Sequence, residues 1–315
     1  MKRGFLALFA LGLIGLIGFW YLTIPTPITS TELARAITSH KPDLANGERI
    51  FNIGGCVSCH AAKGAKDADR LKLLGGQAFK TPFGTFRAPN ISQDPDTGIG
   101  RWSIGDIVNA VKRGVSLDGQ HYYPAFPYTS YARLEMNDAL DLAAYLKSLP
   151  AVPNHVADHD LTFPFNIRRG LGLWKLLFLK TEPVVALANA SEDARRGQYL
   201  VEGPGHCGEC HTPRNAIGGP DLTRWLAGAP VLDGENGRTP DITPAPKALG
   251  NWSSSDISDY LANGMTPDGD FAGGAMAEVV GNLGHIPKSD RDAIAAYLRA
   301  IPPLDPVVVA KPASN

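Results

Sequence analysis

The chain opens with a long run of apolar residues. Lys2 and Arg3 precede a stretch from Gly4 to Leu22 that holds no charged residue. Folded as a helix, this stretch would measure roughly 28 Å, close to the apolar thickness of a bilayer. We therefore predict a transmembrane helix within residues 1–24, with the two basic residues on the cytoplasmic side.

The end of this apolar run favours an uncleaved anchor over a cleaved signal peptide. Trp20 and Tyr21 suit the far membrane interface, where aromatic residues concentrate. The only sequence resembling a cleavage site, Ala-Arg-Ala at 34–36, lies about fourteen residues past the run. Pro25 and Pro27 predict a stiff tether. We expect an inner-membrane anchor with the rest of the chain in the periplasm.

Beyond the anchor, helical signals recur in short segments. Residues 103–114 and 253–264 each begin with serine, carry aspartate three residues later and end on glycine. Serine followed by an acid at this spacing resembles a capping box, and glycine is the favoured residue just past a helix end. Each half therefore contains a helix with well-marked ends.

A further segment in each half shows the apolar face of an amphipathic helix. It starts at Asn137 or Ser289, both good N-caps, and ends before Pro150 or Pro302. A first helical segment precedes these in each half and carries two cysteines. No alternating pattern of 4–8 residues stands out as a strand. We therefore predict an all-α protein of short helices.

The two halves repeat each other at offsets of 150 to 152 residues. The matches pair residues 86–91 with 237–242, 102–103 with 252–253, and 144–146 with 296–298. A length of 315 residues also suits two domains. The predicted domains are residues 41–150 and 191–303, with a linker at 151–190 and a tail at 304–315.

The strongest chemical signal is a pentapeptide that occurs once in each half. It reads C-x-x-C-H and comprises Cys56, Cys59 and His60, then Cys207, Cys210 and His211. Two thiols at this spacing lie on one side of a helical turn, where they can bond the two vinyl groups of one porphyrin. The adjacent histidine can then bind the iron as its proximal ligand. We predict two covalently attached haem c groups.

The two C-x-x-C pairs have two alternative interpretations. Two C-x-x-C pairs could form a structural zinc site, although the pairs lie 151 residues apart in sequence. A single C-x-x-C could also be a thiol–disulfide redox motif. Haem attachment is preferred because each motif heads its own repeat and ends on histidine.

Charge balance narrows the possible partners. The chain has 30 basic and 31 acidic residues, for a formal net charge of −1. Nothing in this balance suggests a nucleic-acid partner. Glycine and proline together make 59 residues, which predicts much loop between the helices.

Within the linker, residues 171–179 are apolar apart from Lys175. Arg168 and Arg169 precede this stretch and Lys180 follows it. It is too short to span a membrane. We expect a helix packed between the two domains, and the alternative is an interfacial helix that touches lipid or a membrane-bound partner.

A sixth iron ligand is predicted for the second haem alone. Met276, flanked by glycine and alanine, lies in the expected loop between the second and third helices. A haem with histidine and methionine ligands has a raised potential, which suits electron carriage.

The first half lacks an equivalent methionine. The position 150 residues before Met276 is Phe126, which cannot bind iron. Met136 fits a hydrophobic staple beside a helix start. His121 would give a bis-histidine haem, or the site could stay five-coordinate, and these alternatives stay open. The sequence therefore predicts two unlike haems.

Four more residues occupy equivalent positions in the repeats. Arg87 and Arg238 could pair with haem propionates or be ordinary surface arginines. Trp102 and Trp252 could donate to a propionate, but packing on the ring is the preferred reading. Five histidines without a counterpart in the other repeat are expected to face solvent: His40, His155, His159, His206 and His285.

Short helices around a haem describe a class I cytochrome c domain, and several segments make the likeness more specific. The chain resembles the cytochrome c subunits of bacterial membrane-bound periplasmic dehydrogenases, the alcohol dehydrogenase cytochrome subunit family, over residues 43–303. The segments that carry the resemblance are residues 81–85, 123–128, 199–203, 207–215, 224–228 and 274–278.

This resemblance implies an electron-transfer subunit rather than an enzyme. Such a subunit would accept electrons from a dehydrogenase catalytic subunit and pass them to membrane quinone or a terminal oxidase chain. The alcohol dehydrogenase subunits usually carry three haem motifs and a methionine where this chain has Phe126. We therefore expect a plainer dihaem carrier serving an aldehyde or sugar dehydrogenase.

The alternative is a haem enzyme, such as a dihaem peroxidase, with an open sixth site on the first haem. Such a site needs a distal acid or base, and His121 is the evident candidate. No glutamine or glutamate lies close to Phe126 in sequence, so the carrier is preferred.

Overall fold

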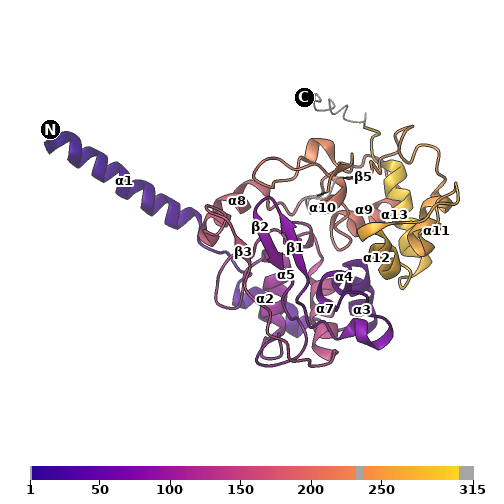
Figure 1. Ribbon diagram of the computed structural model, residues 1–315, viewed down its shortest axis with the longest axis horizontal. Helices are drawn as coiled ribbons and strands as arrows, with labels where there is room; N and C mark the ends of the chain where they lie inside the picture. Colours follow the sequence, from indigo (N-terminus) through magenta and orange to yellow (C-terminus); the bar gives the residue numbers. More distant parts are fainter. Residues whose placement is uncertain (1, 232–236, 305–315) are drawn as a thin grey trace.

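A computed structural model describes residues 2–231 and 237–304 of the chain. Figure 1 shows helix α1 (Lys2–Leu22) standing apart from a folded body, with no buried residue. Among the described residues it is the one helix long and apolar enough to cross a membrane. The predicted anchor therefore folds as a single exposed helix. The predicted tail lies outside the described residues from residue 305 onward.

The first half of the body surrounds one hydrophobic cluster, in which Phe51, Val108 and Ala143 are fully buried. The cluster draws on helices far apart in sequence, so it closes only when all of them are in place. These helices are α2 (Ser30–Ser39), α3 (Leu44–Ile53), α4 (Cys56–His60), α5 (Ile104–Arg113), α6 (Tyr128–Tyr131) and α7 (Met136–Ser148), with a 3₁₀ turn η1 (Asp67–Leu71).

A second hydrophobic cluster fills the other half, with Leu200, Leu226 and Tyr297 at its centre. The repeat is visible in the order of the elements, which follows that of the first half. They are α9 (Glu192–Glu202), α10 (Gly208–His211), the 3₁₀ turn η3 (Leu222–Arg224), α11 (Ser254–Asn263), α12 (Gly274–Leu283) and α13 (Lys288–Ala300).

The predicted ends of the middle helices are confirmed. Ser103 and Ser253 each cap their helix in a complete capping box with the aspartate three residues on. Gly114 and Gly264 end these helices in the left-handed conformation, at φ of 58° and 78°. Glycine adopts this conformation without the steric cost that a side chain brings.

The predicted starts of the third helices are wrong. Helices α7 and α13 begin at Met136 and Lys288, with Glu135 and Pro287 in the capping positions and no side-chain cap. Burial of the apolar face against the core stabilises these helices without a capping hydrogen bond.

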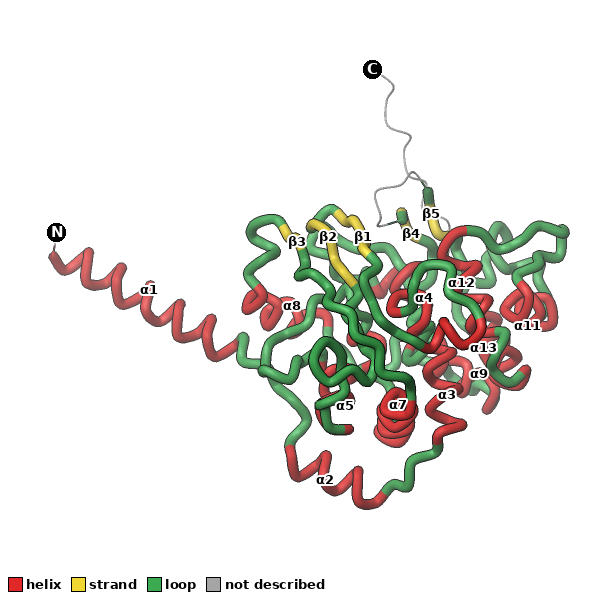
Figure 2. Tube along the Cα trace, turned by 60° about the horizontal axis from the view of Figure 1, so that its bottom comes forward, coloured by secondary structure: helices red, strands yellow, loops and turns green. Residues whose placement is uncertain are grey.

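In both halves the first and last helices cross at a glycine. A Cβ atom at Gly47 would lie 2.2 Å from the backbone oxygen of Asp141, and one at Gly197 would lie 1.8 Å from that of Ala293. Only glycine therefore allows α3 to approach α7, and α9 to approach α13, at these points. Figure 2 shows α3 beside α7, and α9 beside α13.

Two small antiparallel sheets correct the all-α prediction. In the first, β1 (Ala78–Thr81) pairs with β2 (Gly84–Arg87), which pairs with β3 (Asp160–Leu161). In the second, β4 (Ala229–Pro230) pairs with β5 (Arg238–Thr239). Strands of two to four residues are too short to show an alternating pattern in the sequence.

The linker packs against both halves, as predicted. It contains a 3₁₀ turn, η2 (Arg168–Gly170), and helix α8 (Leu171–Phe178). Trp174 donates from Nε1 to the Ile217 carbonyl at 2.9 Å. On the other side, Lys175 donates to the Gly114 carbonyl at 2.8 Å.

The prediction of a stiff tether after α1 is wrong, because the residue that follows the helix, Thr23, is packed against the body. Thr23 is fully buried, and Arg169 donates from Nε to its hydroxyl at 2.8 Å. The same guanidinium lies 4.1 Å from the ring centre of Trp20. The prolines restrict the backbone of this segment, but they do not reveal whether it is packed.

Candidate functional site

The first C-x-x-C-H motif occupies its own short helix. Gly54 ends α3, and Gly55, in the left-handed conformation at φ 56°, redirects the chain into α4. Cys56 and Cys59 are free thiols separated by nearly one helical turn, so they lie on one side of α4. His60 is the last residue of α4 and directly follows Cys59.

The second motif repeats this arrangement on α10. Cys207 is the residue before the helix, while Cys210 and His211 end it. A Cβ atom at Gly208 would lie 2.0 Å from the Trp225 ring, so the indole packs directly on the motif backbone. Both cysteines are free thiols.

Each motif histidine is held by a proline carbonyl 29 residues further on. His60 Nδ1 lies 2.8 Å from the Pro89 oxygen, and His211 Nδ1 lies 2.8 Å from the Pro240 oxygen. Since a carbonyl only accepts, Nδ1 carries the proton and Nε2 keeps its lone pair. Within the described part of the chain, no group forms a hydrogen bond with the Nε2 atom of His60 or of His211.

Burial lowers the pKa of His60 and of His211, although the carbonyl contacts oppose this shift. Both rings are therefore neutral near pH 7, which is the form that binds iron. A hydrogen bond to the other ring nitrogen is the usual way in which a protein orients a metal-binding histidine. The donor set fits a haem c group in each half.

The zinc reading has no geometric support in residues 2–231 and 237–304. No three histidine, cysteine or acidic side chains gather there in a group that could hold a metal ion.

Met276 lies in the first turn of helix α12, so its predicted loop position is wrong. The preceding glycines do not prevent the helix, because Gly273 caps it and Gly274 takes a positive φ of 54° at its first position. The Met276 side chain is half-buried against the second hydrophobic cluster.

In the first half, the two candidate ligands, Met136 and His121, have different surroundings. Phe126 and Met136 are half-buried against the first hydrophobic cluster. His121 is 4 % exposed, and its Nε2 lies 2.9 Å from the Thr23 carbonyl at the root of α1. Since a carbonyl only accepts, Nε2 donates to Thr23 and fixes the ring against the end of α1, while Nδ1 keeps its lone pair and has no hydrogen-bond partner among the described residues.

The paired arginines and tryptophans differ in their surroundings. Arg87 donates from Nη1 to the Asp158 carbonyl at 2.5 Å, whereas Arg238 is exposed on β5. Trp102 packs against the first hydrophobic cluster and Trp252 against the second.

The two motifs lie against each other, a contact that sequence analysis missed. Asn282 on α12 donates from Nδ2 to Ser58 Oγ at 2.8 Å, and its Oδ1 accepts from Arg70 at 2.9 Å. His206, just before the second motif, lies 3.1 Å from the Gly54 carbonyl through Nε2. The prediction that His206 faces solvent is therefore wrong.

A charged side chain inside the second motif also joins the two halves. Glu209 accepts hydrogen bonds from Thr129 at 2.8 Å and Ser130 at 2.7 Å, both on α6. Arg214 pairs with the same carboxylate. These partners lower the pKa of Glu209 despite its burial, so it stays ionised. No sequence signal identified this contact between the halves, because the α6 partners of Glu209 lie about 80 positions away.

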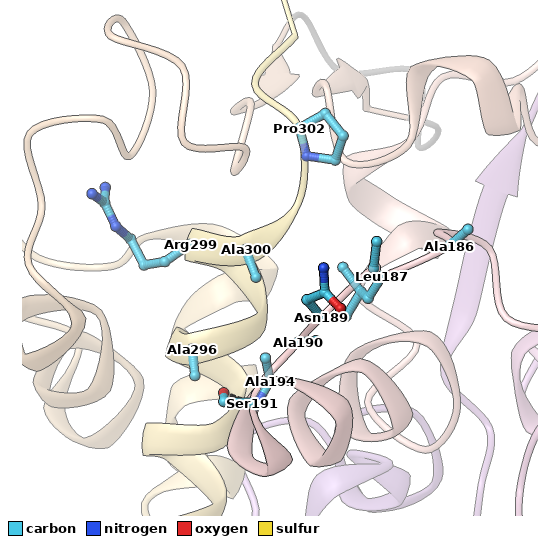
Figure 3. Close-up of a pocket in the computed structure, with 11 residues that line it drawn as sticks. Ala186, Leu187, Asn189, Ala190, Ser191, Ala194, Ala296, Arg299, Ala300 and Pro302 are labelled. Carbon is cyan, nitrogen blue, oxygen red and sulfur yellow. Dashed lines mark hydrogen bonds between the residues drawn. The ribbon is translucent and has the colours of Figure 1, made fainter.

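A surface hollow lies between the linker and α13, away from both motifs. Figure 3 shows its lining of small side chains, with Asn189 and Ser191 on one wall and Ala296 on the other. Arg299 extends away from the hollow and donates to the carbonyls of Leu249 and Gly250. The hollow therefore presents few polar groups that could bind a ligand.

The paired motifs, each with an oriented histidine, define a c-type cytochrome. The cytochrome c family model matches residues 44–150. A diheme cytochrome c-type protein of Cereibacter sphaeroides is 50 % identical over 97 % of this chain and all of its own length. The chain belongs to the family of dihaem c-type cytochromes.

Cytochrome subunits of dehydrogenases are also similar to this chain. The fructose dehydrogenase cytochrome subunit of Gluconobacter japonicus is 34 % identical over 89 % of the chain, which spans 55 % of that subunit. The alcohol dehydrogenase (quinone) cytochrome c subunit of Gluconobacter oxydans is 32 % identical over 96 % of the chain, which spans 61 % of that subunit.

These relatives confirm two predictions. The protein has two covalently bound haem c groups, and it is an electron-transfer component rather than a catalytic enzyme. The peroxidase alternative finds no support in these relatives.

Proposed function

We propose that this protein carries electrons from the catalytic subunit of a dehydrogenase to the respiratory chain, on the quinone or oxidase side. Dehydrogenase cytochrome subunits that share a third of its sequence support the first partner. The haem-bearing part is arranged as two tandem cytochrome c domains, residues 41–150 and 191–303. The two hydrophobic clusters and the repeated order of helices support this division.

The matched pair of histidine–proline hydrogen bonds carries this proposal. Haem c, when bound, supplies an iron that accepts and releases one electron. The residues proposed to hold it are Cys56, Cys59 and His60 in the first domain, and Cys207, Cys210 and His211 in the second. His60 and His211 present a fixed, neutral Nε2, so no proton needs to leave before the iron is bound.

Met276 is the proposed sixth ligand of the second haem. Its thioether lies on the first turn of α12, against the cluster that also contains Cys207. The first domain presents Phe126 at the equivalent place, so its haem has a different ligand set. Unlike ligands give unlike potentials, which sets a preferred direction for an electron moving between the two domains.

The proposed location is the periplasmic face of the inner membrane. Helix α1 has the length and composition of a membrane span, and Lys2 and Arg3 precede its apolar run. Basic residues favour the cytoplasmic side, which places the body on the other side. Covalent haem attachment in bacteria takes place in that compartment.

Mass spectrometry and stopped-flow reduction test the proposal together. The mature protein should weigh two haems more than its polypeptide, and Cys56→Ala/Cys59→Ala or Cys207→Ala/Cys210→Ala should each remove one. A co-expressed dehydrogenase catalytic subunit with its substrate should reduce both haems rapidly. A haem-loaded protein that such a subunit fails to reduce, or that turns over peroxide alone, would refute the carrier function.

A further inference from the structure

Helix α8 exposes a row of leucines. Leu173, Leu176 and Leu177 are 39 %, 56 % and 60 % exposed. Residues at these spacings share one face of a helix, and we call this row the leucine stripe. Trp174 and Lys175, on the other side of α8, are buried against the body. The helix is therefore amphipathic, with an apolar outer face.

The leucine stripe lies at the root of α1. Gly172 on α8 packs directly on Thr23, since a Cβ atom at Gly172 would lie 2.5 Å from Thr23 Cα. Figure 1 shows α8 beside the point where α1 joins the body. Arg169 stacks on Trp20, an aromatic residue of the kind found at headgroup level. The start of α8 therefore lies at the same depth as the end of the membrane span.

The residues flanking α8 also suit a lipid surface. Arg168 and Arg169 precede the helix and Lys180 follows it, so both ends carry positive charge. Ile167, beside the two arginines, is 49 % exposed and extends the apolar surface. Basic residues around an apolar face are typical of helices that lie in the interface of anionic membranes.

We propose that the leucine stripe lies in the periplasmic leaflet of the membrane that α1 spans. The inference rests on the membrane placement given under the proposed function. Because α1 and α8 are fixed to each other, insertion of both sets the orientation of the whole body. The first domain then lies next to the membrane, and α11, α12 and α13 lie on the far side of the body (Figure 1).

Site-directed spin labelling of the full-length, haem-loaded protein tests this docking in vesicles of phosphatidylethanolamine and phosphatidylglycerol. Haem attachment uses the four native thiols, so one introduced cysteine is the only site for the label. Leu176→Cys and Leu177→Cys place the label on the stripe. Leu13→Cys places it within α1, and Phe271→Cys, at a residue 72 % exposed between α11 and α12, serves as the aqueous control.

At each label, relaxation by oxygen, which dissolves in lipid, is compared with relaxation by a water-soluble nickel chelate. We expect the oxygen-to-nickel ratio at Leu176 and Leu177 to be several-fold higher than at Phe271 and to approach that at Leu13. A ratio equal to that at Phe271, with a high ratio at Leu13, would overturn the docking alone. A low ratio at Leu13 would overturn the anchor itself.

A protein partner on the stripe gives a different result. Labels at Leu176 and Leu177 would then be shielded from both reagents, which also overturns lipid docking. The ratio is measured within one label, so relaxation by the nearby haem iron affects both reagents alike.

Discussion

Asn282 donates a hydrogen bond to Ser58 at 2.8 Å, although 224 residues separate them in sequence. Ser58 stands between the two cysteines of the first motif, and Asn282 lies on α12, the helix that bears Met276. One amide side chain therefore joins the first haem-attachment helix to the proposed ligand helix of the second haem. Residues proposed to serve the two haems therefore meet at this contact between the two halves of the chain.

Asn282→Ala should destabilise the protein by about 1–3 kcal/mol. The change removes a buried amide and leaves the half-buried side chains of Ser58 and Arg70 without this partner. Urea unfolding followed by haem absorbance measures the loss. Asn251→Ala, at an exposed position, is the matched control and should change stability by less than about 0.5 kcal/mol. Equal effects of the two changes would contradict the coupling role of Asn282.

The ferric protein should show a high-spin signal from about half of its haem, because Phe126 offers no ligand to the first iron. Phe126→Met should convert most of that signal to low spin and raise the potential of the first haem. Electron paramagnetic resonance and a redox titration report the two changes. Two low-spin haems in the unchanged protein would contradict the open site and point to another ligand.

Met276→Leu should remove the sixth ligand of the second haem. The high-spin fraction should then rise from about half to nearly all of the haem, and the higher of the two potentials should fall. Leucine keeps the volume of the half-buried side chain, so the fold should persist. Met265→Leu, at a residue 49 % exposed, is the matched control. An unchanged spectrum in Met276→Leu would exclude this methionine as a ligand.

Lys175 should make stability depend on pH. Burial, reinforced by Arg113, lowers the pKa of Lys175 from 10.5 to about 7. Between these values the unfolded chain binds the proton and the folded protein does not. The free energy of unfolding should therefore rise with pH from about 7 to 10, by up to about 1.4 kcal/mol per pH unit.

Lys175→Met should abolish this part of the pH dependence, which urea unfolding at pH 7, 8, 9 and 10 would reveal. Lys180→Met removes the same charge from an exposed position nearby and should leave the slope unchanged. A slope that survives in Lys175→Met would assign the dependence to another group.

The parts of the fold that depend on local interactions could be predicted from the sequence. The capping boxes at Ser103 and Ser253 and the glycine ends at Gly114 and Gly264 involve residues only a few positions apart. The C-x-x-C-H motifs are equally local. The starts of α7 and α13 could not be predicted, because packing against the core, rather than a capping residue, decides them.

The sequence predicted the cysteines and histidines that would hold each haem, but not the hydrogen bonds that surround them. The bonds from His60 to Pro89 and from His211 to Pro240 join residues with no pattern that marks them as partners. Glu209, Asn282 and His206 each form a hydrogen bond with the other half of the chain. The role of His121 was ambiguous because its partner, Thr23, lies 98 positions away at the root of α1.

The packing of Thr23, at the end of α1, against the body restricts how the protein can meet its partners. A carrier joined to its anchor by a flexible linker could reorient freely above the membrane and present either haem to any neighbour. Arg169 and His121 hold the end of α1 to the body. For the membrane-anchored carrier proposed above, the large motions left would be rotation about the membrane normal and lateral diffusion. Encounters would then be a search in two dimensions, in which the height of a donor or acceptor above the lipid would decide which haem it can reach.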